Sequence, residues 1–338
     1  LLRCESGAEP NSEPGTRLLS MMDGATGALA WSYEMPYDEL KGDGGLKAVQ
    51  VTADLSGADN IQDIIGYCKD TVFIFSGKGG TRSEIKLGQA ITSLDVISNG
   101  PSGDAFAVGT SGGLGIYDSA GTSLWTTTTA DWIGDQSGRF MALDDINFDG
   151  VSDLAVISDT RIALLRSIAG TPKYELAWIL PADDGWTIGP IEMVADSDGD
   201  GIREVAYFQE GGSGVQETTH GHDHIPPRHL LCVESPENGH SLFRADPQGR
   251  VLAYDLACGD FNGDGHLDSV LLVDPADSDR GSSLWLQVLS GTDGTLMWTH
   301  ANVGHGGNLG RMGSNRLPVT NVGDINGDGA DDLAFSVA

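Results

Sequence analysis

The sequence predicts an all-β protein built from repeated four-stranded sheets, and three observations support this. Apolar runs such as "LAVIS" and "RIALLRS" alternate with turns rich in Gly, Asp and Ser. These runs are about four to eight residues long, as β-strands are, and no long segment has the period of a helix. An acidic nine-residue loop followed by an apolar strand recurs along the chain.

Four intact copies of this loop are "DINFDGVSD" from Asp145, "DSDGDGIRE" from Asp196, "DFNGDGHLD" from Asp260 and "DINGDGADD" from Asp324. Two altered relatives begin near Asp54 and Asp95, so successive loops start 41 to 64 residues apart. A four-stranded propeller blade has a period of about 40 to 50 residues, and radial repetition of sheets leaves few exposed edges. We therefore expect residues 1–338 to form a single β-propeller domain. About seven blades are expected, within a range of about six to eight, each starting near one of these loops.

A glycine turn that ends in an aromatic residue also repeats. The glycine stands four residues before the aromatic in the pairs Gly27 and Trp31, Gly121 and Trp125, Gly239 and Phe243, and Gly294 and Trp298. A large aromatic side chain buries about 150 to 250 Å² when it is enclosed. We expect these aromatics to pack between neighbouring sheets.

The nine-residue loop has the residue types of a calcium site between strands. Hard divalent cations take six or more oxygen ligands, and a loop that alternates ligand and spacer can surround one ion. Positions 1, 3, 5 and 9 offer side-chain oxygens, position 7 a backbone carbonyl, and the glycine at position 6 allows a sharp turn. The predicted ligands are Asp145, Asn147, Asp149, Val151 and Asp153; Asp196, Asp198, Asp200, Ile202 and Glu204; Asp260, Asn262, Asp264, His266 and Asp268; and Asp324, Asn326, Asp328, Ala330 and Asp332.

Two other interpretations of the acidic loops compete with calcium. One is a solvated turn, and the other is a catalytic pair of carboxylates. Acid and base catalysis needs two carboxylates in unlike environments, which four near-identical loops do not offer. Several anions packed together are unfavourable without a cation, Mg²⁺ prefers to keep its waters, and softer metals prefer Cys or His. Calcium at about four sites is therefore the favoured cofactor.

The charge of the chain excludes several classes of partner. Nineteen basic against 49 acidic residues give a net charge of −30, which repels nucleic acids and anionic membranes. Of the acids, 36 are Asp and 13 are Glu, and short Asp side chains suit turns and cation loops. No apolar run approaches the roughly 18 residues of a membrane span. The first residues lack an initiator Met and a signal-peptide pattern, so we expect a piece of a longer chain.

The cysteines have no zinc-type spacing, which leaves buried thiols or at most two disulfides. The cysteines are Cys4, Cys68, Cys232 and Cys258. Among disulfides, Cys232 with Cys258 is favoured, because each lies on or beside a predicted strand of one repeat.

Histidines gather in an insertion over residues 211–229, which contains His220, His222, His224 and His229. Alternating histidines of this kind can bind Zn²⁺ or Cu²⁺, and a flexible exposed loop is the favoured alternative. His300 and His305 precede the last acidic loop. They could line the axial face of a propeller, although a bond to the backbone is the simpler role.

The pattern D-x-[DN]-x-D-G-x-x-[DE] followed by an apolar strand resembles the FG-GAP repeat family, including VCBS-type repeats and the integrin α-chain propeller. The resemblance covers most of the chain and implies a seven- or eight-bladed propeller with calcium in loops at one rim. It also implies an extracellular protein used for adhesion or as a scaffold. The Phe-Gly and Gly-Ala-Pro signatures of the family are not evident, and the loops at Asp54 and Asp95 depart from the pattern.

The leading functional hypothesis is a non-catalytic, calcium-binding β-propeller that is secreted or lies at the cell surface. It would bind a protein or carbohydrate, other domains of its own chain or further copies, as an adhesion or structural module such as a part of a cell-surface assembly. None of its eleven asparagines lies in an N-x-[ST] sequon, which favours a prokaryotic source. The main alternative is a calcium-dependent polysaccharide lyase or glycoside hydrolase on the same scaffold. "DGATGALAW" also resembles the tryptophan-docking repeat of quinoproteins, but the chain has no adjacent Cys pair to support a quinoprotein dehydrogenase.

Overall fold

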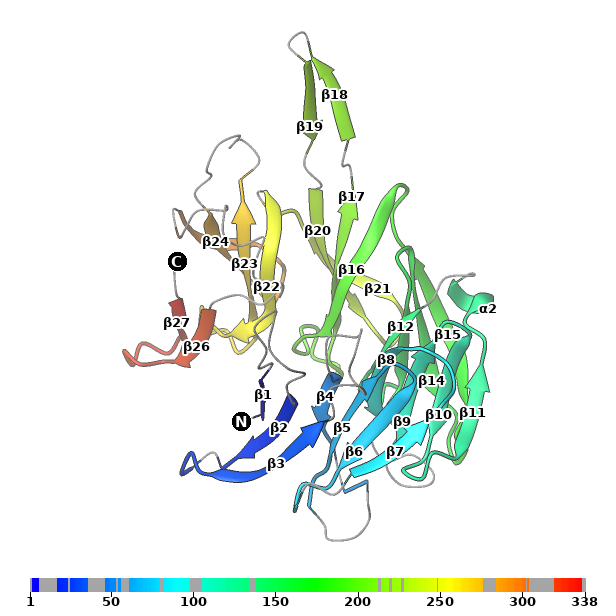
Figure 1. Cartoon of the computed structure of the whole chain (residues 1–338). Helices are drawn as coiled ribbons and strands as arrows, with labels where there is room; N and C mark the ends of the chain where they lie inside the picture. The colour runs from blue at the N-terminus through cyan, green and yellow to red at the C-terminus, as the bar shows by residue number, and fades with distance from the viewer. Residues whose placement is uncertain are drawn as a thin grey trace. The chain divides into compact units, whose positions relative to one another are not determined.

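The computed structural model shows an all-β chain (Figure 1). It describes residues 2–5, 17–23, 25–35, 46–52, 54–55, 61–79, 82–97, 105–133, 138–211, 214–218, 221–225, 228–247, 249–275, 284–301, 303 and 319–335. These residues contain one short helix, α2 (Ala130–Ile133), and otherwise strands and turns. No helix among them is long and apolar enough to span a membrane.

The chain divides into two compact units, which we call the first and second unit. The first comprises residues 1–158 and 163–176, and the second comprises 159–162 and 177–338. Three sheets lie wholly within the first unit, in the orders β1-β2-β3, β4-β5-β6-β7 and β8-β9-β10-β11. Their strands are β1 (Leu2–Glu5), β2 (Arg17–Met22), β3 (Leu29–Met35), β4 (Lys47–Val51), β5 (Ile64–Cys68), β6 (Thr71–Phe75), β7 (Arg82–Lys86), β8 (Ile91–Ile97), β9 (Ala105–Thr110), β10 (Gly113–Tyr117) and β11 (Ser123–Thr127).

The following sheets have the same sequential order. The sheet β12-β13-β14-β15 is made of Arg139–Ala142, Leu154–Ile157, Arg161–Ser167 and Tyr174–Pro181. In the second unit, β16 (Trp186–Met193), β17 (Val205–Gly211), β20 (Arg228–Ser235) and β21 (His240–Ala245) form one sheet. β22 (Arg250–Gly259), β23 (Asp268–Asp274), β24 (Trp285–Leu289) and β25 (Leu296–His300) form another. β26 (Val319–Gly323) and β27 (Asp332–Phe335) form a two-stranded sheet.

Burial explains why the middle strands are continuous apolar runs. Every residue of β5 and β6 is buried, whereas the outer strand β25 is mostly exposed. A strand covered on both faces needs apolar residues at every position, and an outer strand does not. Between consecutive sheets lie apolar cores, such as the one where Tyr67 and Ile74 meet Leu94 and Phe106. The predicted repetition of four-stranded antiparallel sheets is confirmed.

Of the glycine-turn aromatics, Trp31, Trp125 and Phe243 pack against the following sheet, as predicted, whereas Trp298 is 37% exposed. Trp31 Nε1 of β3 donates to the carbonyl of Gly77, which follows β6, at 2.9 Å. Trp125 of β11 lies 5.6 Å, centroid to centroid, from Tyr174 of β15. The turn glycines have φ values from +68° to +81° at Gly27, Gly121, Gly239 and Gly294, a conformation that only glycine adopts easily. Trp178, which the repeat pattern did not identify, donates from Nε1 to the carbonyl of Pro236 at 3.0 Å.

Two expectations about the connections need correction. Asp95 was expected in a loop but lies inside β8, where its Oδ2 accepts the Ala142 N–H at 2.7 Å. The acidic loops do not precede a sheet; they join its first strand to its second, as the loop at 260–268 joins β22 to β23. A short loop can connect two antiparallel neighbours in this way, so each loop lies at the end of one sheet.

The insertion at 211–229 was expected as a loop, but it contains a hairpin of β18 (Gly214–Thr218) and β19 (Gly221–Ile225). The hairpin extends from the ends of β17 and β20 and pairs with no other strand among the described residues (Figure 1). His229 lies beyond it in β20 and is buried, with Nε2 2.7 Å from Glu210 Oε1.

The predicted disulfide between Cys232 and Cys258 is wrong, because both residues are free thiols, as is Cys68. The Cys232 sulfur is buried within its sheet, 3.6 Å from Gln209 Nε2. Cys258 packs instead in the core that β23 and β24 share with Val319 and Leu333. The two sulfurs thus lie in different environments, Cys232 within its own sheet and Cys258 in the next core. Burial raises the pKa of each thiol to about 11.

Replacing Trp31 with Phe tests the contact between sheets. The variant keeps most of the apolar surface but loses the hydrogen bond to Gly77, so unfolding should require about 0.5–1.5 kcal/mol less free energy. Urea denaturation followed by circular dichroism measures the change. Trp298→Phe is the control, because Trp298 holds the same place in its turn but is 37% exposed. An equal loss in both variants would contradict the role given to the hydrogen bond.

Candidate metal loops

All four intact loops fold by the same set of hydrogen bonds. The carboxylate at position 1 accepts the N–H of position 6, at 2.6 Å for Asp145 and 2.8–2.9 Å in the other three loops. The side-chain oxygen at position 3 accepts the N–H of position 5, and that at position 5 accepts the N–H of position 7. The short acids and Asn therefore bond the backbone of their own loop.

Left-handed backbone is required at two positions, of which the sequence identified one. The glycines at position 6 have φ from +88° to +92° in the four loops. Position 4 is also left-handed, with φ from +74° to +82° at Gly199, Gly263 and Gly327. In the first loop this position is Phe148, which has φ +58° and is 73% exposed. A bulky residue in this conformation is strained, so the first loop tolerates a less favourable backbone than its sister loops.

The residue at position 9 is buried at the start of the second strand in three loops. Asp153, Glu204 and Asp268 are each 0% exposed, whereas Asp332 is only partly buried. In every loop this carboxylate accepts the N–H of position 2, at 2.8–2.9 Å. We call Asp153, Glu204, Asp268 and Asp332 the closing carboxylates, because each joins the two ends of its loop.

The first altered loop has a closing residue that the sequence comparison missed. Asp63 is 0% exposed and immediately precedes β5, as Asp153 precedes β13. Its Oδ1 accepts the N–H of Gly77 at 3.2 Å. A carboxylate directly before an apolar strand was the signal that could have found it, because the spacing from Asp54 is one residue longer than in the intact loops.

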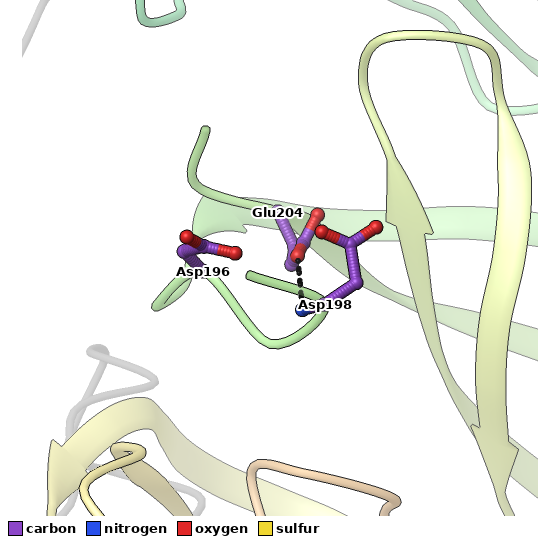
Figure 2. Close-up of side chains that lie close together, drawn as sticks. All are labelled: Asp196, Asp198 and Glu204. Carbon is purple, nitrogen blue, oxygen red and sulfur yellow. Dashed lines mark hydrogen bonds between the residues drawn. The ribbon is translucent and has the colours of Figure 1, made fainter. Parts of the chain in front are cut away.

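The loop at 196–204 brings carboxylates closest together. Oxygens of Asp196, Asp198 and Glu204 lie within 4.8 Å of one another, and no other such group occurs in the part of the chain described here. Figure 2 shows the Glu204 side chain between the other two carboxylates. Glu204 Oε1 accepts the N–H of Ser197 at 2.9 Å and of Asp198 at 3.4 Å. Its Oε2 is buried without a hydrogen-bond partner among the described residues.

This unpartnered oxygen fits a bound cation. A buried carboxylate oxygen without a donor is unfavourable, and an ion of opposite charge relieves both its desolvation and the repulsion from Asp196 and Asp198. The donor set is oxygen only, which suits a hard cation such as Ca²⁺.

Burial raises the pKa of three closing carboxylates. Desolvation is the main cause at Asp153, Glu204 and Asp268, and the pKa of Glu204 reaches about 7. Nearby aspartates add to the effect, since Asp198 and Asp200 repel a charge on Glu204. The opposite holds at the exposed Asp324, where backbone N–H groups, that of Gly329 first, lower the pKa.

Three of the loops contact one another within the second unit. His266 Nδ1 lies 3.2 Å from the carbonyl oxygen of Asp196. Asp331 N–H donates to the Asp260 carbonyl at 2.7 Å, and the Asp260 N–H donates to Asp331 Oδ2 at 3.1 Å. The loops from Asp196, Asp260 and Asp324 therefore form a continuous acidic row, which the sequence spacing alone did not predict.

The histidines form no site that can be described. His220 and the side chains of His222 and His224 lie outside the described residues, as does His305, so zinc or copper binding there stays a prediction. His300 lies at the end of β25 with its ring 5.8 Å from that of Phe335, centroid to centroid.

Solved structures with a similar fold include BBS1N in a complex with ARL6DN, with TM-score 0.50 and 12% identity over 86% of this chain and 79% of that one. Sqt1 of Saccharomyces cerevisiae has TM-score 0.52 and 12% identity, covering 85% and 68%. Rhamnogalacturonan lyase YesW has TM-score 0.52 and 13% identity, covering 98% and 65%. These neighbours are β-propeller or WD40-like folds. The fold is propeller-like. No protein-family model and no curated protein matches the sequence, and at these identities the likeness shows the fold alone.

The pH dependence of the calcium-free protein tests the environment of Glu204. Its pKa is raised from 4.5 to about 7, so the protonated form is favoured by folding. The stability that this group contributes is present below about pH 4.5 and is lost as the pH rises through about 7. In EDTA, the melting temperature of the wild type should therefore fall as the pH rises from about 4.5 to about 7, and this fall should be smaller in Glu204→Gln. Glu175→Gln, at an exposed site on β15, is the control, and an unchanged profile in Glu204→Gln would contradict the assignment.

Proposed function

We propose that the chain is a calcium-stabilised β-propeller that serves as a binding or structural module. Among the described residues, five complete four-stranded sheets and two partial ones, apart from the β18–β19 hairpin, support a count of seven blades. The recurrence of D-x-[DN]-x-D-G-x-x-[DE] at the same place in successive sheets supports a relationship to FG-GAP repeats. Each loop would hold one ion, through the side chains of positions 1, 3, 5 and 9 and the carbonyl of position 7.

The observation that carries the proposal is the convergence of Asp196, Asp198 and Glu204 around a buried oxygen without a donor. A solvated turn would leave such a carboxylate at the surface, where water satisfies it. A bound Ca²⁺ would supply the missing positive charge and fix the loop that joins β16 to β17.

The type of site supports an extracellular location. Loop sites of extracellular modules bind calcium with dissociation constants of about 10⁻⁴–10⁻³ M, which requires the calcium concentration found outside cells. The net charge of −30 further supports a protein whose surface is partly neutralised by bound cations. With calcium holding the loops, other surfaces of the sheets would contact a protein or carbohydrate on a cell surface or in a matrix.

Calcium should raise the stability of the protein. An ion that binds only the folded state adds about 2.7 kcal/mol per site when its concentration is 100 times the dissociation constant. Differential scanning calorimetry in about 10 mM CaCl₂, which is about 10 to 100 times the dissociation constant of a weak site, and in EDTA measures the shift in melting temperature. MgCl₂ at the same ionic strength is the control. Identical melts in calcium and EDTA would remove the basis of the proposal.

Single-loop variants test whether the sites are separate. Asp264→Asn removes one carboxylate from the loop at 260–268 and should lower the number of bound calcium ions by one in isothermal titration calorimetry. Asp255→Asn, outside all four loops, is the control for loss of one charge. Loss of every site in Asp264→Asn would contradict independent binding.

The enzyme alternative makes a different prediction. A polysaccharide lyase would release unsaturated products absorbing in the ultraviolet, and a hydrolase would release new reducing ends. Incubation with acidic polysaccharides in calcium should give neither if the chain is a binding module. Release of either product at a rate that depends on protein concentration would favour the enzyme.

A further inference from the structure

The second oxygen of each buried closing carboxylate distinguishes the loops. In three sheets this oxygen accepts a backbone N–H from the last residue of the third strand or from the turn that follows it. The pairs are Asp63 with Gly77 at 3.2 Å, Asp153 with Ser167 at 2.6 Å and Asp268 with Gly291 at 2.9 Å. Both oxygens of Asp153 and of Asp268 therefore already have a backbone donor, one from the loop and one from the end of the third strand or the turn after it.

The sheet of Glu204 has a proline where the others have this donor. Pro236 follows β20 and stands three residues before Gly239, as Gly291 stands three residues before Gly294. Both glycines are left-handed, with φ +69° and +71°, so the two turns correspond. Proline has no N–H, and its carbonyl is used by Trp178 Nε1 at 3.0 Å. This explains physically why Glu204 Oε2 is buried without a partner.

We propose that a metal ion replaces the missing N–H, so that Glu204 Oε2 is a direct ligand and the loop at 196–204 is the primary metal site of the chain. The inference rests on the proposed function, because it assumes that these loops bind a hard cation. The buried closing carboxylates Asp153 and Asp268 are held by two backbone donors each and bind metal more weakly, since an ion must compete with those donors.

Two further observations support this ranking. The group within 4.8 Å includes Asp198 at position 3, where the other three loops have Asn, so this loop offers the ion one more carboxylate. The closing residue here is Glu, whereas the other loops have Asp. The extra methylene lets the carboxylate reach further from the strand, toward Asp196 and Asp198 rather than toward the turn.

The ranking also makes one sheet more dependent on metal than the others. Glu204 immediately precedes β17 and Pro236 immediately follows β20, which are the central strands of their sheet. The same two strands extend into the β18–β19 hairpin (Figure 1). Metal at this loop would thus fix the end of the sheet that lies opposite the hairpin.

Calcium titration of matched variants tests the proposal. In wild type, isothermal titration calorimetry with CaCl₂ should show one tight step followed by weaker ones. Glu204→Gln should weaken the tight step at least ~10-fold and leave the weaker steps, because a direct ligand is lost. Asp153→Asn, the matched change in the first loop, should leave the tight step intact. If Asp153→Asn removed the tight step, or Glu204→Gln left it intact, the ranking would be overturned.

Pro236→Ala tests the cause without changing any acidic residue. Alanine restores the N–H, so in EDTA this variant should melt at a higher temperature than wild type, and its tight calcium step should weaken. The gain in EDTA should disappear in the Glu204→Gln background. A lower melting temperature in EDTA, or an unchanged tight step, would overturn the role given to Pro236.

The outcomes separate this inference from the proposed function. Calcium binding with equal affinity at all loops would overturn the ranking and leave the calcium-stabilised propeller standing. Absence of calcium binding in wild type would overturn both. Circular dichroism of each variant checks that the fold is retained.

Discussion

A carboxylate buried at the start of the second strand is the constraint on which four of the sheets depend. Asp63, Asp153, Glu204 and Asp268 occupy this place and have no exposed surface. A charged group in such a position must be matched by donors or by a cation, because its hydration has been removed. Where the donors are backbone N–H groups, they come from the acidic loop and from the end of the third strand or the turn after it. The carboxylate thus fixes two separate connections of one sheet relative to each other.

Similar loops can therefore serve different physical roles. Asp268 is satisfied by the N–H groups of Phe261 and Gly291, so its loop is a stable turn even without an ion. Glu204 has the first of these donors and not the second, because Pro236 occupies the place of the second. The difference in donors between these two closing carboxylates thus arises from a residue outside the loop, in a connection to a different strand.

Contacts between consecutive sheets use a second repeated device. The side chains of Trp31, Trp125 and Trp178 reach the following sheet, and the indole N–H groups of Trp31 and Trp178 bond carbonyls there. At Pro236 the two devices meet, since its carbonyl accepts from Trp178 while its ring nitrogen fails to donate to Glu204. The acidic loops of the second unit also contact each other through His266 and Asp331. The three loops are thereby physically connected to their neighbours.

The sequence by itself determined the all-β class, the repeated sheets, the four acidic loops and the aromatics between sheets, because these depend on local patterns of residue type. Its errors at Asp95, at the 211–229 insertion and at the proposed Cys232–Cys258 disulfide concern where a residue lies across strands, which local patterns do not specify. Only the tertiary structure decided that the loops join first and second strands, that Asp63 is a closing residue, and that Glu204 lacks a donor. Glu204 and Pro236 are distant in sequence, and only the pairing of β17 with β20 brings the two connections together.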